Sequence, residues 1–205
     1  MSEMKILHIN DVSNVASNLV AGQKELGFHA EIFRIPKVSA YSNKIGWFLL
    51  PFKRFENAIR LRRYVSKYKF DVIHVHFATH AWMVQMMGLP YFLHVHGSDV
   101  RRYMYTPVYR ELIIAAIKNA IKVFYVTPEL KNHLRNIRPD AIFLPNPINI
   151  NEFNAHTKSN FPTGQILCIS KLDRYKGVED FLKTIELVWN ARPDVTVGMF
   201  NFGNM

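Results

Sequence analysis

Short apolar runs alternate with longer stretches of helical periodicity along most of the chain. The runs lie at residues 5–9, 30–35, 70–77, 91–96, 123–126 and 141–144. Those at 70–77 and 91–96 are almost continuously apolar or β-branched, as in strands buried on both faces of a parallel sheet. Helical stretches separate them at residues 12–26, 53–69, 108–121 and 129–136. Parallel strands need crossover connections that are usually helical, so this order predicts an α/β fold with a doubly wound parallel sheet.

A polar segment rich in turn-forming residues interrupts this pattern between Pro145 and Gly164. Such a segment is typical of a linker between domains. The strand and helix pattern then resumes at residues 165–169, 177–189 and 195–200. We therefore expect one α/β domain at residues 1–153, a linker at 154–164 and the incomplete beginning of a second, similar domain at 165–205.

Composition narrows the class of protein. The 205 residues exceed one domain but fall short of two nucleotide-binding-type domains, which need roughly 150 residues each. The single cysteine, Cys168, rules out an intramolecular disulfide and a cysteine-based metal site, which suits a reducing compartment. The N-terminus lacks the basic region of a signal peptide, and no apolar stretch reaches the ~20 residues of a membrane span. We expect a cytoplasmic protein.

The net charge of +10 and the pI near 9.7 change this picture in one respect. Such a charge predicts attraction to a polyanion, which could be nucleic acid, an anionic lipid surface or the phosphate groups of a substrate. Nucleic acid is the least favoured of these, because no recognised binding motif is present and the basic residues gather in one helix. We therefore expect no nucleic-acid partner.

Candidate chemistry lies just beyond the strands, because ligands of open α/β sheets bind at the carboxyl ends of the strands. The residues at these positions are Asn10, Asp11, Ser13, His76, His80, His96, Gly97, Ser98, Asp99, Thr127 and Asn146, together with the run 170–177.

The richest of these segments is His94-Val-His-Gly-Ser-Asp99. In a strand, His94 and His96 point to the same face, and Gly97 allows a tight turn or a close approach to a ligand. His96 lies at the strand tip, where an imidazole could polarise a hydroxyl or donate to a phosphate or sugar oxygen. For His94 we favour a structural role in the sheet.

Other motifs point away from metal and cofactor chemistry. His74, His76 and His80 could form a metal site with the histidines of the next strand, but there is no HExxH motif and no Cys/His spacing. We favour histidines of the core or the cleft rim, and we expect neither a metal nor a cofactor. There is also no Gly-x-Gly-x-x-Gly motif and no phosphate-binding P-loop.

Three basic residues, Lys171, Arg174 and Lys176, lie between a predicted strand and a helix that opens near Gly177. Backbone N–H groups and the helix dipole favour an anion at such a position, and a diphosphate fits it. The alternative is a solvated basic loop at the start of a helix.

Taken together, these segments resemble the glycosyltransferases of family 4, which have the GT-B fold. The resemblance rests on Phe70-Asp-Val-Ile-His-Val-His76, on His96-Gly-Ser-Asp99, on Pro145-Asn146 and on Ser170-Lys-Leu-Asp-Arg-Tyr-Lys-Gly-Val178. It implies two Rossmann-like domains, an acceptor-side domain followed by a donor domain of which this chain has the beginning. It also implies transfer of a hexosyl-type sugar from a nucleotide-diphosphate donor, with retention of configuration and without an obligatory metal.

The resemblance also assigns roles to residues. His96 would lie beside the transferred sugar, and Lys171 and Lys176, with Arg174, would neutralise the leaving diphosphate. The cleft and acceptor residues would be Asn10, Asp11, Ser13, Gly97, Ser98, Asp99 and Thr127.

Three departures from the family pattern qualify these roles. Lys171 replaces the usual arginine, which keeps the charge but loses the bidentate fork. The loop at 10–14 lacks the paired glycines that many members have near the diphosphate. The paired glutamates that hold the sugar and ribose are absent from these 205 residues. We therefore expect the chain alone to bind acceptor and to be a poor or inactive catalyst.

Two alternatives remain open at this point. The chain could be a non-catalytic module that binds acceptor or membrane and needs a separate donor-domain partner. The helix at 53–69, preceded by an apolar segment at 47–50, resembles a membrane-surface patch, which predicts peripheral binding to an anionic inner membrane face and a lipid-linked acceptor. Its basic residues are Lys53, Arg54, Arg60, Arg63 and Lys67, and a merely solvated basic face is the alternative.

Overall fold

A computed structural model describes residues 3–36, 44–150, 165–169 and 176–200 of the chain. The chain divides into two compact units, Met1–Glu152 and Phe153–Met205. Each unit is an α/β structure, and the two are described separately below.

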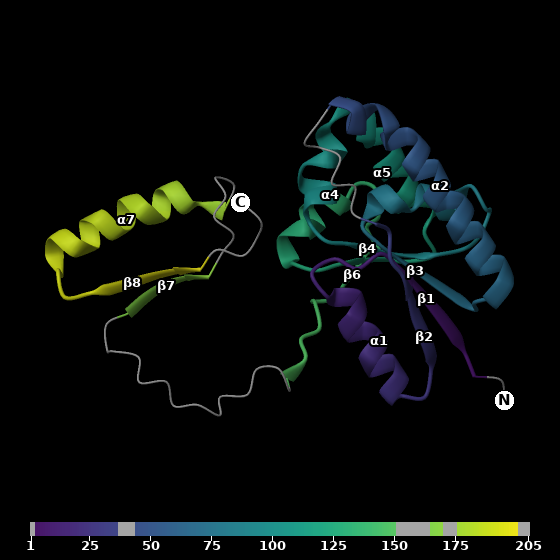
Figure 1. Cartoon of the computed structure of the whole chain (residues 1–205), viewed down its shortest axis with the longest axis horizontal. Coiled ribbons are helices and arrows are strands. Elements are labelled where there is room, and N and C mark those ends of the chain that lie inside the picture. The colour runs from purple at the N-terminus through teal and green to yellow at the C-terminus, as the bar shows by residue number, and fades with distance from the viewer. Residues whose placement is uncertain (1–2, 37–43, 151–164, 170–175, 201–205) are drawn as a thin grey trace. The chain divides into compact units, whose positions relative to one another are not determined.

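The first unit contains a parallel sheet of six strands in the order β2-β1-β3-β4-β5-β6 (Figure 1). The strands are β1 (Lys5–Ile9), β2 (His29–Phe33), β3 (Val72–His76), β4 (Phe92–Val95), β5 (Val123–Tyr125) and β6 (Ile142–Phe143). The order reverses at β1, which pairs with β2 on one side and with β3 on the other. This confirms the predicted α/β class and doubly wound parallel sheet.

Helices connect these strands. They are α1 (Val15–Glu25), α2 (Lys44–Tyr68), α3 (Trp82–Gln85), α4 (Ser98–Arg101), α5 (Pro107–Asn119) and α6 (Lys131–Leu134), with short 3-10 turns η2 (Ala78–His80), η3 (Tyr103–Tyr105) and η4 (Pro128–Leu130). The helix predicted at 129–136 is thus a 3-10 turn followed by one α-helical turn. Among the described residues, no helix has both the length and the apolarity to span a membrane.

The two faces of this sheet are covered unequally. Helix α1 lies on one side, whereas α2, α4 and α5 lie on the other (Figure 1). On the side of α2 and α5, the strand residues Leu7, Val75 and Leu93 form one continuous apolar core with helix residues such as Leu61 and Ile117. The apolar cluster on the side of α1 is small and consists of Ile6, Val20 and Ala30, with partly buried neighbours.

The second unit consists of β7 (Gln165–Ile169), α7 (Val178–Ala191) and β8 (Thr196–Phe200), and its two strands pair in parallel. Ile185 of α7 is buried. Most of the other large apolar side chains described in this unit are exposed: Leu167, Ile169, Leu182, Leu187, Trp189 and Met199. A sheet of two strands with one helix is a single β-α-β unit, which leaves much of its apolar surface uncovered.

Candidate functional site

A pocket of about 580 Å³ opens in the first unit where β1 and β3 end. The loop after β1 contributes Asn10, Asp11, Val12 and Ser13, and the segment after β3 contributes Phe77, Thr79 and His80. Helices and loops around it supply Ile35, Pro36, Arg54, Asn57, Trp82, Met83 and Tyr103. The pocket therefore brings together three of the predicted cleft residues, namely Asn10, Asp11 and Ser13.

The backbone around this pocket adopts conformations that non-glycine residues rarely have. Asn10, Ser13 and Phe77 have φ values of 68°, 51° and 80°. Such conformations are strained for bulky residues such as Phe77, and strain of this kind concentrates at functional sites. The loop after β1 thus takes left-handed turns at asparagine and serine, and its residues 10–14 include no glycine.

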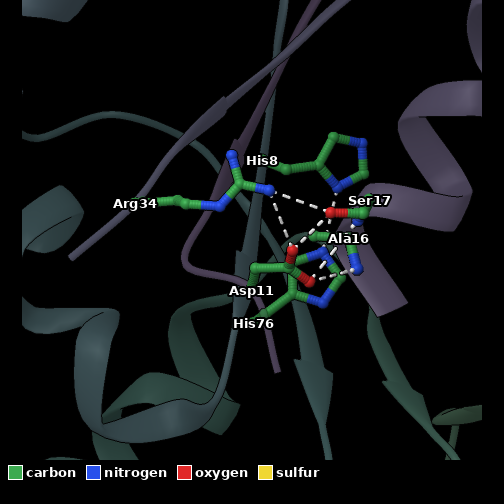
Figure 2. A network of polar contacts seen from close by, with 6 residues as sticks. All are labelled: His8, Asp11, Ala16, Ser17, Arg34 and His76. Carbon is green, nitrogen blue, oxygen red and sulfur yellow. Dashed lines mark hydrogen bonds and ion pairs between the residues drawn. The ribbon is translucent and has the colours of Figure 1, made fainter. Parts of the chain in front are cut away.

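Asp11 holds the loop after β1 against the start of α1 (Figure 2). Its carboxylate accepts hydrogen bonds from the backbone N–H of Ala16 at 3.1 Å and from the Ser17 hydroxyl. It also pairs with the Arg34 guanidinium at 3.2 Å. The carboxylate already occupies the positive end of the helix dipole, so this helix start is not open to a phosphate.

The polar groups of the pocket wall come from two further elements. Arg54 of α2 donates to the Tyr109 hydroxyl at 3.2 Å. Burial and the charge of Arg54 lower the pKa of His80 to about 4, so His80 is neutral at pH 7. Arg54 is half-buried and lines the pocket, and its predicted part in a basic membrane-facing surface stays a prediction.

Sequence reasoning missed Asn57, Trp82 and Tyr103 as pocket residues. Trp82 and Tyr103 belong to short elements that reach the pocket only through tertiary packing, and no sequence signal marks them. Asn57 does carry a signal, because it precedes the buried Leu61 by four residues and thus shares the inward face of α2. A buried polar residue on that face could have been recognised.

The turn after β4 is built around Asp99. Its fully buried carboxylate accepts hydrogen bonds from the N–H groups of Gly97 at 2.9 Å, His96 at 3.2 Å and Ala78 at 3.2 Å. Burial raises the pKa of this carboxyl, although the N–H donors oppose that shift. Asp99 therefore fixes the turn and ties it to the segment after β3, while the neighbouring Ser98 is exposed.

Gly97 is required in this turn. Its φ is 116°, and a Cβ atom added there would lie 2.8 Å from the Arg101 guanidinium.

Thr127 follows β5. It donates its hydroxyl to Glu129 at 2.7 Å, and Glu129 pairs with Arg101 at 3.0 Å. Gly97, Ser98, Asp99 and Thr127 do not line the 580 Å³ pocket.

His96 ends a layer of histidines that crosses the sheet. His8 of β1 is the register partner of His74, and His76 is the register partner of His94, so these side chains share one face with His96. His8 Nδ1 lies 2.9 Å from His76 Nε2, and His76 Nδ1 lies 3.1 Å from His96 Nε2.

Burial is the main cause that keeps these rings neutral. It lowers the pKa of His94 to about 4 and that of His96 to about 3. The pKa values of His74 and His76 are lowered well below 6.5, first by burial and then by the neighbouring histidines. The structural role predicted for His94 stays a prediction; its Nε2 donates to the backbone oxygen of Leu144 at 3.3 Å.

Two sets of three histidines have the spacing that a metal ion would need. They are His8, His74 and His76, and His76, His94 and His96, with ligand nitrogens within 4.8 Å of one another in each set. The nitrogens His74 Nε2 and His94 Nδ1 are buried and have no hydrogen-bond partner among the described residues. Both ring nitrogens of His8 and of His76, in contrast, are already engaged in hydrogen bonds, with each other, with Gln23 and with His96.

The predicted diphosphate residues belong to the second unit. Lys176 is exposed and directly precedes Gly177. Gly177 has a φ of 74° and is the N-cap residue of α7. Lys171 and Arg174 lie outside the described residues. Their roles stay predictions.

A doubly wound parallel sheet with a pocket beyond the ends of β1 and β3 is typical of a Rossmann-like domain. Solved structures agree with this class. Sucrose-phosphate synthase from Thermosynechococcus elongatus superimposes with a TM-score of 0.73 at 15% identity, over 98% of this chain and 63% of that chain. A putative UDP-N-acetylglucosamine 2-epimerase from Listeria monocytogenes gives 0.62 at 14% identity, over 100% and 64%. S. aureus MnaA, solved with UDP, gives 0.61 at 14%, also over 100% and 64%.

The chain belongs to Glycosyltransferase Family 4, whose family model matches residues 12–152. This confirms the resemblance inferred from the motifs. No curated protein matched the chain. The chain spans about 63–64% of the length of the solved structures named above, and at 14–15% identity those likenesses concern the fold alone.

Proposed function

We propose that this chain is the acceptor-side part of a glycosyltransferase that moves a sugar from a nucleotide-diphosphate sugar to an acceptor, with retention of configuration. The observation that carries this proposal is the 580 Å³ pocket, whose lining residues nearly all fall within the segment that matches the family model. Its position at the carboxyl ends of parallel strands is where such folds bind ligands.

The chemistry of the pocket suits a sugar-bearing acceptor. Trp82, Phe77 and Tyr103 provide aromatic surfaces, against which the apolar faces of a sugar ring pack. Arg54 and Asn57 add hydrogen-bonding groups that can fix the orientation of hydroxyl groups. A largely apolar pocket with a few convergent polar groups is the usual form of a small-molecule site.

The donor belongs to the second part of this proposal. Lys171, Lys176 and Arg174 would neutralise the leaving diphosphate, and His96 would contact the transferred sugar. Residues 165–205 would then be the beginning of the nucleotide-sugar-binding domain. Support comes from the family membership and from the position of Lys176 just before α7, where backbone N–H groups favour an anion. That one structural relative was solved with UDP is compatible with such a donor.

Saturation-transfer NMR with a panel of sugar glycosides tests the acceptor pocket. We expect Trp82→Leu to weaken glycoside binding about tenfold, the equivalent of roughly 1.4 kcal/mol. Met86→Ala is the matched control, because Met86 directly follows α3 but is exposed and lies outside the pocket. Equal losses in both variants would refute the pocket assignment.

The same measurement separates the two functional classes. Binding of a UDP, GDP or ADP sugar in addition to a glycoside supports the transferase. Glycoside binding without any donor binding supports the alternative, a non-catalytic acceptor module that works with a separate donor-domain partner.

We further propose that α2 rests on an anionic membrane surface. Phe52 and Phe55 are 67% and 56% exposed, and Ile59 continues this stripe along the helix. The exposed basic residues beside it are Lys53, Arg60, Arg62, Arg63 and Lys67. Apolar side chains next to basic ones are typical of helices that lie in the membrane interface.

Vesicle flotation tests this surface. We expect the protein to float with vesicles that contain anionic lipid and to remain unbound with neutral ones, and Phe52→Ser/Phe55→Ser to abolish flotation. Val108→Ser, at an apolar residue of α5 that is 83% exposed, is the control that should not change it. Equal partitioning into neutral and anionic vesicles would contradict the proposal.

A further inference from the structure

Three consecutive hydrogen bonds connect helix α1 to His96. The Gln23 amide oxygen Oε1 lies 2.8 Å from His8 Nε2. His8 Nδ1 lies 2.9 Å from His76 Nε2, and His76 Nδ1 lies 3.1 Å from His96 Nε2. Each histidine between the two ends uses both ring nitrogens, so the contacts form one unbranched chain across β1 and β3 to the tip of β4.

The positions of the protons in this chain follow from its first member. An amide oxygen only accepts, so His8 must carry its proton on Nε2. A neutral imidazole has one N–H group, so His8 Nδ1 accepts, and the proton between His8 and His76 belongs to His76 Nε2. By the same step, His76 Nδ1 accepts from His96 Nε2.

Burial supports the neutrality on which this reasoning depends. It is the largest cause that lowers the pKa values of His8, His76 and His96, the last to about 3. Asp11 is the acidic group that opposes these shifts at His8 and His96. At pH 7 each ring therefore has one donor and one acceptor nitrogen.

We propose that Gln23 is a positioning residue that fixes His96 as the Nε2-protonated tautomer, so that His96 offers an unprotonated Nδ1 to the substrate. His96 then accepts a hydrogen bond from a sugar hydroxyl and does not donate one to a phosphate oxygen. The substrate group that His96 Nδ1 would contact rests on the proposed function, whereas the tautomer of His96 does not depend on it.

The neighbouring histidines cannot set this tautomer. His94 stacks on His96 with ring centroids 4.8 Å apart, but its Nε2 donates to the Leu144 backbone oxygen. Within the described part of the chain, neither His94 Nδ1 nor His74 Nε2 has a hydrogen-bond partner. Among the residues that the structure describes, only the contact between His8 and Gln23 supplies these hydrogen bonds with a group that cannot donate.

Long-range ¹H–¹⁵N NMR of histidine-labelled protein tests the proposal, because a protonated ring nitrogen and an unprotonated one give well-separated ¹⁵N shifts. His96→Asn identifies the His96 signals by their loss. In the unmodified protein we expect His96 with a proton on Nε2 and a bare Nδ1. A proton on Nδ1 would overturn the proposal without any measurement of activity.

Variants of Gln23 test its role directly. Gln23→Met keeps the size but removes the acceptor, so the His96 shifts should move toward a mixture of both tautomers. Gln23→Lys offers only a donor and should reverse the chain, placing the proton on His96 Nδ1.

Asn18→Leu is the matched control on the same helix, because its amide donates to the Pro147 backbone oxygen and does not contact a histidine. It should leave the His96 shifts unchanged. If Gln23→Met also leaves them unchanged in a folded protein, as judged by its backbone amide spectrum, Gln23 does not position His96. Absence of glycoside binding together with the expected shifts would count against the proposed function alone.

Discussion

On the face of the sheet toward α2 and α5, adjacent strands contribute Leu7, Val75 and Leu93, all fully buried in one apolar core. On the face toward α1, the same strands contribute His8, His76 and His94, which are buried to the same extent. Apolar burial stabilises the first face by removing hydrocarbon from water. The second face buries polar rings that need hydrogen-bond partners, which it supplies only in part.

This difference suggests that one face of the sheet serves mainly stability and the other mainly the site. The apolar face holds the strands in register and so fixes where they end. The histidine face stabilises the fold less, because it buries polar rings, but it provides the hydrogen-bonded chain that leads to His96 at the strand tip. Polar networks of this kind are stabilising only where every member is satisfied, and His74 Nε2 and His94 Nδ1 are not.

Acid should have the largest effect, and it acts on the histidine face. The folded-state pKa values of His94 and His96 are about 4 and about 3, below the ordinary 6.5 of an unfolded chain. Below pH 6.5 the unfolded state therefore binds more protons, so stability is lost as the pH falls. Each such histidine contributes about 1.4 kcal/mol per pH unit in that window. Urea denaturation at pH 7.5 and pH 5 should differ by several kcal/mol, and a pH-independent free energy of unfolding would contradict the buried, neutral layer.

Leu93→Ala should have the next largest effect, since it breaks the apolar face at its centre. Leu93 is fully buried between β3 and β5, so its removal leaves a cavity in the core. We expect a loss of about 2–5 kcal/mol in the free energy of unfolding, measured by urea denaturation. Leu26→Ala, at a leucine that is 76% exposed, is the control and should change it by less than about 0.5 kcal/mol.

The apolar face is the part of the fold that sequence reasoning reaches most easily. The runs at 5–9 and 123–126 correspond closely to β1 and β5, because continuous apolar strands have few alternative structures. Helix α2 begins at Lys44 and not near residue 53, and it passes through Pro51, which the pattern of polar residues did not indicate. The helix predicted at 129–136 is too long. The sequence there has helical spacing, but only one α-helical turn, α6, forms after the 3-10 turn η4.

The candidate site was only partly predictable. Asn10, Asp11 and Ser13 follow from the rule that strand ends carry chemistry, and they do line the pocket. The spacing of His94 and His96 places both on one face. The connection of His96 to Gln23 depends on the pairing of His8 with His74 and of His76 with His94, which is a matter of strand register and tertiary packing.

His74→Leu should have the smallest effect and gives the sharpest comparison of the two faces. His74 is 8% exposed, and its buried Nε2 has no hydrogen-bond partner in the described part of the chain. A buried polar atom that has lost its water without gaining a partner is destabilising. A leucine of similar size removes that cost and keeps the packing against Phe124. We expect the free energy of unfolding, measured by urea denaturation at pH 7.5, to rise or to fall by no more than about 1 kcal/mol.

His76→Leu is the counterpart of His74→Leu. It removes a ring with two hydrogen bonds and leaves a nitrogen of His8 and a nitrogen of His96 without these partners. That variant should be the less stable of the two, and the opposite order would mean that the hydrogen-bonded chain does not stabilise this face.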